Sequence, residues 1–176
     1  MPVRIQTADE LTQLTPAEKR VAELLVAGAS NAQGGRDLGM STTTFAGHVG
    51  NIGRKFQITS RLGRPARAHA VLDSGQIAPP AAPAAVPEFT PAELRLLRAF
   101  AKYPETHDIA HAAGIAQADV RPQIKELVAK AGADNETHLI GLSHAWELLG
   151  AEPNETSSTA TEATDPRRRS AQSRAV

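Results

Sequence analysis

The feature that most constrains the fold of this chain is a helix-start pattern that occurs twice. LTPAEKRVAELL begins at Leu14, and FTPAELRLLRAF begins at Phe89. In both stretches a Thr precedes a Pro, which suits the first helical position, and a Glu follows the Thr three residues on, as in a capping box. Such a start rarely recurs by chance with the same four residues, so the sequence predicts a duplicated helical unit.

The two segments align without a gap when the numbering is shifted by 75. Gly39 then matches Gly114, and Lys55 matches Lys130. Few positions are identical, but apolar residues coincide at Val21/Leu96, Met40/Ile115, Val49/Ile124 and Ile52/Leu127. These shared apolar positions predict that both segments bury the same helix faces.

The stretch IAPPAAPAAVPE, from Ile77 to Glu88, separates the two segments. Proline fixes φ and has no backbone N–H, so this stretch predicts a semi-rigid extended spacer and neither helix nor central strand. From Pro153 onward the chain is polar and almost free of large apolar residues, which predicts disorder. We therefore expect an N-terminal arm at 1–13, a first domain at 14–77, a Pro/Ala-rich linker at 78–88, a second domain at 89–150 and a disordered tail at 151–176.

Helical periodicity runs through both segments, and neither shows the period-two alternation of a strand. Helices are expected from Thr15 to Gly28, over Asn31–Leu38, from Ser41 to Phe56 and over Pro65–Asp73, and again near 90–102, 106–113, 117–130 and 136–149. Gly39 suits a turn with positive φ between the second and third helices. The expected fold is all-α, with two small four-helix domains that each contain a helix-turn-helix. The turn alone leaves open a plain helical bundle that binds no ligand.

The composition excludes several kinds of site. Cysteine is absent, which removes disulfides and thiolate zinc sites. His107 and His111 have the i,i+4 spacing of metal ligands, but no third ligand is evident, so we expect no metal and no cofactor. No nucleophile–base pair, phosphate loop or paired-carboxylate motif predicts an enzyme. The N-terminus has no apolar signal region and no apolar run is long enough to span a membrane, so we expect a cytoplasmic protein.

The balanced charge of the whole chain hides a segregation. The totals are 19 basic and 19 acidic residues, but residues 1–77 hold nine basic and six acidic ones, whereas residues 78–150 hold six and nine. From Leu38 to Leu72 there is no acidic residue, and the basic residues there are Arg54, Lys55, Arg61, Arg64 and Arg67. A basic region of this kind favours phosphate contacts.

A particular series of motifs runs from Leu14 to Arg61. LTPAE is followed by an apolar helix ending in Ala-Gly, then by Ser-Asn, LGMS, TF, HV, NI, RKF and finally SR. In this order the motifs resemble the LuxR-type (GerE-like) DNA-binding domain of bacterial transcription regulators, and the second segment resembles it more weakly. In that family the third of four helices enters the DNA major groove and the fourth commonly dimerises. The resemblance implies a nucleoid-associated protein whose partner is double-stranded DNA, with a possible homodimer or protein partner through the second domain.

Polar residues of the expected third helix and of the following loop are the candidate DNA contacts. Arg54 and Lys55 are expected to bind phosphates. The hydroxyls at the start of the helix suit phosphates or bases, and Asn51 suits an adenine edge or a phosphate. His48 lies beside the apolar stripe, where packing, a hydrogen bond or a phosphate contact is expected. The complete candidate set is Thr42, Thr43, Thr44, His48, Asn51, Arg54, Lys55, Arg61 and Arg64.

The first segment departs from the family pattern in its third helix. The family favours basic or amide residues at the two positions after Phe45, but here they are Ala46 and Gly47. Glycines recur at Gly50 and Gly53, and each glycine in a helix interior costs about 1 kcal/mol relative to alanine. The second helix also has Gly34-Gly35 where the family has an apolar residue and Ala. These changes predict phosphate affinity with reduced base specificity.

The second segment departs further. Pro122 lies in its expected third helix, where it costs about 3 kcal/mol unless the helix starts at Arg121. Acidic residues that would repel phosphates occur at Glu105, Asp108, Asp119 and Glu126. The sequence therefore predicts a DNA-binding transcriptional regulator that uses its first helix-turn-helix. The alternative is a helical adaptor whose degenerate modules bind another regulator or self-associate, with little DNA affinity.

Overall fold

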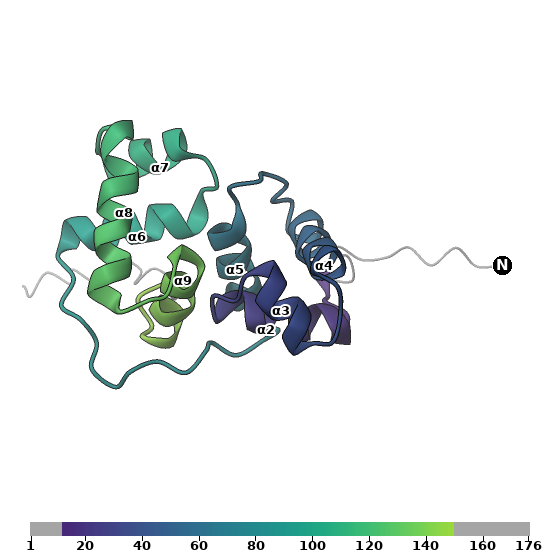
Figure 1. The fold of residues 1–176 in the computed structure, drawn as a ribbon. Coiled ribbons are helices and arrows are strands. Elements are labelled where there is room, and N and C mark those ends of the chain that lie inside the picture. Colours follow the sequence, from purple (N-terminus) through teal and green to yellow (C-terminus); the bar gives the residue numbers. More distant parts are fainter. Residues whose placement is uncertain (1–11, 150–176) are drawn as a thin grey trace, which may run out of the picture.

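The computed structural model describes residues 12–149, and this part of the chain contains eight helices and no strand (Figure 1). The described residues are therefore all-α, as expected. Most of the expected N-terminal arm and the whole of the expected disordered tail lie outside the described residues.

The first four helices form what we call the first helix group. They are α2 (Pro16–Val26), α3 (Asn31–Asp37), α4 (Thr42–Lys55) and α5 (Arg64–Asp73). The Thr15 side chain accepts a hydrogen bond from the Glu18 N–H, and the Glu18 carboxylate accepts one from the Thr15 N–H, which completes the expected capping box. Ser30 and Ser41 are the N-caps of α3 and α4. Each side chain accepts a hydrogen bond from the backbone N–H three residues on.

The last four helices form the second helix group. They are α6 (Pro91–Lys102), α7 (Thr106–Ala113), α8 (Gln117–Ala131) and α9 (Glu136–Ala145). Thr90 and Glu93 form a second capping box at the start of α6. Helix α8 begins at Gln117 and continues through Pro122, so the helix does not start at Arg121.

Helix α9 is shorter than the expected span of 136–149. It ends at Ala145, because Glu147 has a positive φ of 59° and the chain closes with a hydrogen bond from the Leu148 N–H to the Ser143 carbonyl. The Trp146 side chain then donates a hydrogen bond of 3.0 Å to the carbonyl of Pro83. This bond fastens the proline-rich stretch, which contains no helix, to the end of the second helix group.

The turn between α3 and α4 explains two of the unusual glycines. Gly39 has a positive φ of 65°, as expected for the turn residue. A Cβ at Gly34 would overlap the ring of Phe45, which is fully buried, and a Cβ at Gly35 would lie 2.9 Å from the carbonyl of Met40. Helix α3 therefore packs unusually close to α4, and small residues are required there.

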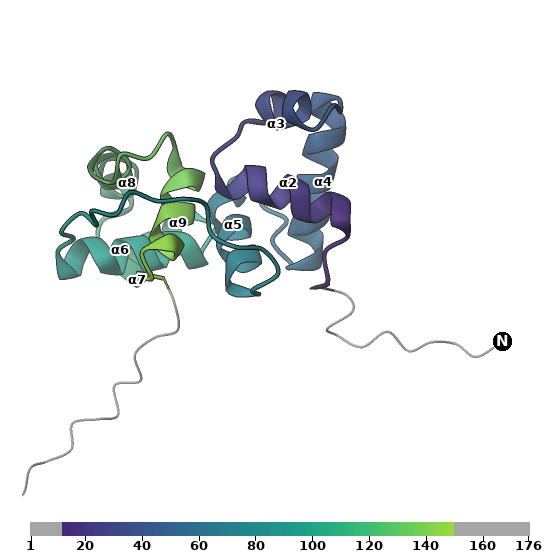
Figure 2. The same cartoon turned by 90° about the horizontal axis from the view of Figure 1, so that it is seen from below.

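The two helix groups pack against each other through their fourth helices. Helices α5 and α9 lie side by side in the middle of the molecule, and each also packs against the first helix of the other group, α5 on α6 and α9 on α2 (Figures 1 and 2). A single hydrophobic core extends through both groups. Helix α4 lies at the end of the molecule away from α6–α9, which leaves its outer face uncovered by the second group (Figure 1).

Candidate nucleic-acid interface

The N-terminal turn of α4 presents hydroxyl groups to solvent. Thr42, Thr43 and Thr44 are all exposed. The Ser41 hydroxyl accepts a 3.0 Å hydrogen bond from the Thr44 N–H and lies 2.8 Å from the Thr44 hydroxyl. Thr44 is therefore partly engaged in the cap, whereas Thr42 and Thr43 extend the exposed start of the helix.

The middle of the outer face of α4 carries no side chains. A Cβ added at Gly47 or Gly50 would meet no atom within 4 Å. Both glycines share a helix face with Thr43 and Arg54. Counted from Thr43, Gly47 is at i+4, Gly50 at i+7 and Arg54 at i+11. The backbone of this face is open to close approach by a partner, but it offers no donor or acceptor side chain for reading a base.

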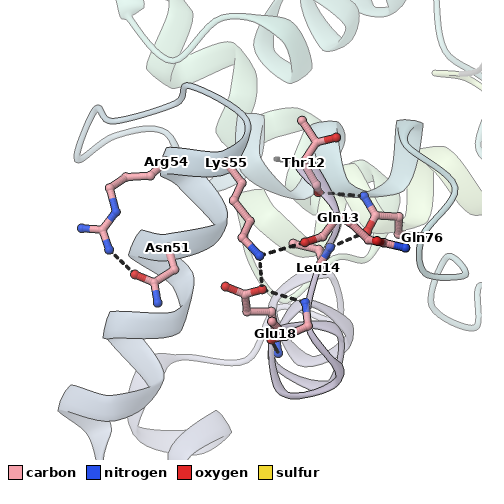
Figure 3. Close-up of polar contacts among 9 residues, drawn as sticks. Thr12, Gln13, Leu14, Glu18, Asn51, Arg54, Lys55 and Gln76 are labelled. Carbon is pink, nitrogen blue, oxygen red and sulfur yellow. Dashed lines mark hydrogen bonds and ion pairs between the residues drawn. The ribbon is translucent and has the colours of Figure 1, made fainter. Parts of the chain in front are cut away.

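Arg54 and Asn51 lie together on the exposed side of α4. The Arg54 guanidinium donates a hydrogen bond to the Asn51 side-chain oxygen, and Figure 3 shows both groups directed away from the N-terminal segment. Arg54 is exposed, and Asn51 is half-buried. The pairing holds the guanidinium at the end of the helix while other N–H groups of the fork stay available to an anion.

Lys55 points to the opposite side and is engaged within the protein. Its ammonium lies 2.6 Å from the Glu18 carboxylate and donates a 2.8 Å hydrogen bond to the Gln13 carbonyl (Figure 3). Burial alone raises the pKa of Glu18, but hydrogen bonds from Lys55 and Thr15 outweigh it and bring the pKa below the usual value. Lys55 thus joins the end of α4 to the start of α2, so its side chain holds α4 in place and does not face the outer surface.

Arg64 and Arg67, at the start of α5, also bond internally. Arg64 donates to the Asn31 side chain at 2.7 Å and to the Ala29 carbonyl at 2.6 Å. Arg67 donates to the carbonyls of Ile58 and Ser60 at 3.1 and 2.8 Å. Burial lowers the pKa of both guanidinium groups, and repulsion by Arg67 adds to the effect at Arg64. These two side chains fix the loops on either side of the helix-turn-helix.

Arg61 differs from Arg64 because it is exposed in the loop between α4 and α5. The cations of the 54–67 region therefore divide by role: Arg54 and Arg61 face solvent, and the other three brace the fold. Two of the candidate DNA contacts, Lys55 and Arg64, are therefore engaged within the protein. The division arises because Lys55 and Arg64 meet partners more than thirty residues away in sequence, and Arg67 meets carbonyls of the loop just before α5.

His48 is half-buried on α4. Its Nδ1 atom is buried and has no hydrogen-bond partner among the described residues. The protein covers this nitrogen, whereas His48 as a whole is only half-buried. Within residues 12–149 no group of three His, Asp or Glu side chains lies close enough to hold a metal ion. Nor does any helix of that region have the length and apolar character needed to cross a membrane.

One structural residue at this site was not anticipated from the sequence. The Gln76 side chain, just after α5, accepts a 2.7 Å hydrogen bond from the Leu14 N–H and donates one of 3.0 Å to the Thr12 carbonyl (Figure 3). These bonds tie the segment before α2 to the end of α5. No motif marks Gln76, because these two partners are more than sixty residues away in sequence.

Comparison with known proteins assigns the region that holds these residues. Residues 12–63 match the family model described as bacterial regulatory proteins, luxR family (GerE), which covers α2, α3, α4 and the loop that follows. No curated protein matches the chain, and no solved structure matches it. Residues 12–63 thus hold a single GerE/LuxR-family helix-turn-helix domain, which suggests a DNA-binding transcription regulator.

Proposed function

We propose that the chain binds duplex DNA through the outer face of α4 and the loop that follows it, and that it regulates transcription by doing so. The observation that carries this proposal is that Thr42 and Thr43 at the start of α4, Arg54 at its end and Arg61 in the following loop are all exposed, in a span without any acidic residue. Helix N-termini and arginine side chains are common phosphate ligands. The GerE/LuxR-family match over the same residues supports it.

The contacts are expected to favour phosphates over bases. Gly47 and Gly50 leave the middle of the outer face bare, so discrimination between base pairs would depend on Thr42, Thr43 and Asn51 alone. Base recognition in the major groove needs hydrogen-bonding side chains at the edge of each base pair. We therefore expect modest sequence preference and a steep dependence of affinity on salt, because phosphate contacts release counterions.

We further propose that the second helix group is a degenerate copy of the first that acts as its built-in partner. The same shift of 75 relates the two capping boxes, and it relates the Lys55–Glu18 ion pair to the Lys130–Glu93 pair, which measures 2.8 Å. It also relates His69 to His144, whose ring nitrogens lie 2.8 Å apart between α5 and α9. A residue that contacts its own counterpart lies on a two-fold axis, as in an isologous dimer.

This arrangement bears on the expected homodimer. The faces of α5 and α9 that meet at the His69–His144 contact already cover each other within one chain. A second chain therefore has no free fourth-helix face of this kind to bind within the described residues. We propose that the first group contacts DNA while the second group packs on it, and that the full chain is a monomer in sedimentation equilibrium.

DNA binding is tested by reversing the two exposed arginines, in Arg54→Glu with Arg61→Glu. We expect affinity for a random-sequence duplex, measured by fluorescence anisotropy at low salt, to fall by at least about tenfold because two phosphate contacts become repulsive. The matched control is Arg95→Glu with Arg98→Glu, two exposed arginines on α6. Equal affinities of wild type and the Arg54/Arg61 variant would refute the proposed interface.

The adaptor function is a second candidate, and a specific observation favours it. Lys55, Arg64 and Arg67 bond internally, and Gly47 and Gly50 leave α4 without base-reading side chains. Both features reduce what the helix offers to DNA. If wild-type protein shows no binding to any duplex at low salt, the adaptor function replaces the DNA-binding one.

A further inference from the structure

A cavity lies at the junction of the two helix groups, within the described part of the chain. It has a volume of about 830 Å³ and is lined by the loops at Gly28–Ser30 and Arg61–Pro65 on one side and by α8 and the start of α9 on the other. Binding sites for small molecules commonly have this size and often lie between packed units. A ligand held there would contact both helix groups.

The floor of the cavity is apolar. Val120, Ile124 and Val128 line it and follow one another at four-residue intervals along α8, and Phe100 and Ile109 extend the surface. Leu62, which is 55% exposed, lines the opposite wall. Burying such an exposed side chain against an apolar ligand is favourable by the hydrophobic effect.

The rim of the cavity is cationic. Arg121 and Lys125 each stand one residue after Val120 and Ile124 on α8, so they form a second row beside the apolar one. Both are exposed, as is Arg61 on the other wall. Glu136 is the only carboxylate among the lining residues. The lining therefore combines an apolar surface with an excess of positive charge contributed from both walls.

We propose that this cavity binds a small, soluble amphipathic anion, with an acyl or aryl body along the apolar row of α8 and a carboxylate at Arg121, Lys125 and Arg61. The charge of the rim selects the anionic head, and the floor selects the apolar body. Neither DNA nor a simple inorganic anion satisfies both parts of the lining. Because Arg61 also belongs to the proposed DNA surface, such a ligand links the junction to that surface, but its binding does not depend on DNA.

The probe for this site is sodium decanoate, below its micellar concentration, added to the ¹⁵N-labelled full-length protein. We expect saturable shifts of amide signals at Val120, Ile124 and Thr137, all of which line the cavity. Acetate, which has the head without the body, is expected to produce none of them. Decyltrimethylammonium, which has the same body with a cationic head, is expected to bind at least about tenfold more weakly, since it cannot form charge-assisted hydrogen bonds to the rim.

Two variants test the two parts of the lining separately. Arg121→Glu with Lys125→Glu is expected to lower the affinity for decanoate at least about tenfold, because it removes hydrogen bonds to the carboxylate. Val128→Phe is expected to lower the affinity for decanoate as well, because the larger side chain fills the apolar part of the cavity. It leaves Arg121, Lys125 and Arg61 unchanged. Arg95→Glu with Arg98→Glu, on exposed positions of α6 outside the cavity, is the matched control and is expected to leave the affinity unchanged.

The proposal is overturned if decanoate produces no saturable shifts, if the shifts map away from the cavity, or if the cationic amphiphile binds equally well. It is also overturned if wild-type protein does not bind decanoate and the Arg121/Lys125 variant loses affinity for duplex DNA. These two cations would then be phosphate contacts. The DNA-binding proposal is tested by other variants, so either proposal can fail while the other stands.

Discussion

Lys55 shows how one residue type serves two different purposes within a few positions. It neighbours Arg54 in sequence, yet the two side chains leave α4 on different sides, toward Glu18 and toward solvent. The Glu18 side chain is 5% exposed, and Lys55 is its only ion-pair partner among the described residues. A buried carboxylate without its partner is costly, so this lysine contributes to stability.

We expect Lys55→Met to lower the free energy of unfolding by about 1–3 kcal/mol, because it leaves the Glu18 carboxylate buried and unpaired. The matched control is Lys130→Met at the corresponding pair with Glu93, where the side chains are 35% and 30% exposed. There a loss below about 1 kcal/mol is expected, as for surface ion pairs. Urea denaturation of both variants measures the difference, and equal losses would contradict a structural role for Lys55.

At the scale of the element, α4 is a helix whose glycines have different reasons to be there. Gly53 is buried, and a Cβ there would lie 2.5 Å from both the Ile58 carbonyl and the Arg67 guanidinium. Gly47 and Gly50 meet no such neighbour. Packing therefore requires Gly53, whereas nothing within the described structure requires the other two.

We expect Gly50→Ala to raise the free energy of unfolding by about 0.5–1 kcal/mol, because alanine loses less backbone entropy in a helix and has open space here. Gly53→Ala, in the same helix, is expected to destabilise the protein, since its methyl group overlaps the loop after α4. Thermal unfolding followed by circular dichroism compares the two. Stabilisation by Gly53→Ala would show that the loop is not packed as described.

At the scale of the molecule, the junction of the helix groups contains a titratable pair. The rings of His69 and His144 lie at the contact of α5 and α9. Burial lowers the pKa of His144 to about 4, with repulsion from His69 adding to the effect and Asp73 opposing it. Burial also lowers the pKa of His69, again opposed by Asp73, with Lys102 adding to it. Both imidazoles are thus neutral in the folded protein near neutral pH.

This pair predicts that the protein loses stability as the pH falls. Between about pH 6.5 and about pH 4 the unfolded chain binds a proton at His144 that the folded chain does not, so the free energy of unfolding decreases through this window. The loss is on the order of 2 kcal/mol. Urea titrations across the window measure it.

The variant for this test is His144→Gln, which is expected to flatten the dependence on pH by removing one of the two depressed groups. His111→Gln, at an exposed position on α7, is the control and is expected to keep the slope of the wild type. Glu18 and Glu93 also have lowered pKa values, but their contribution is lost only as the pH falls below their usual value of 4.5. If the free energy of unfolding of His144→Gln depends on pH as steeply as that of the wild type, His144 is not the source of the dependence.

The sequence by itself determined the helices, because caps, glycine turns and apolar periodicity act over a few residues. Thr15 with Glu18 and Thr90 with Glu93 start α2 and α6, and Gly39 turns the chain between α3 and α4. It also indicated one GerE/LuxR-type domain, which the family match finds at residues 12–63, whereas no match supports the second copy. The end of α9 was misjudged, because the positive φ of Glu147 is not encoded by a glycine.

Only the tertiary structure decided which cations are free and how the helix groups meet. Lys55, Arg64 and Arg67 were indistinguishable from Arg54 and Arg61 in the sequence, because the partners that engage two of them lie more than thirty residues away. The contact of His69 with His144, and the cavity between the helix groups, likewise depend on two surfaces meeting. Such long-range contacts follow from the packing of whole helices, which no local pattern specifies.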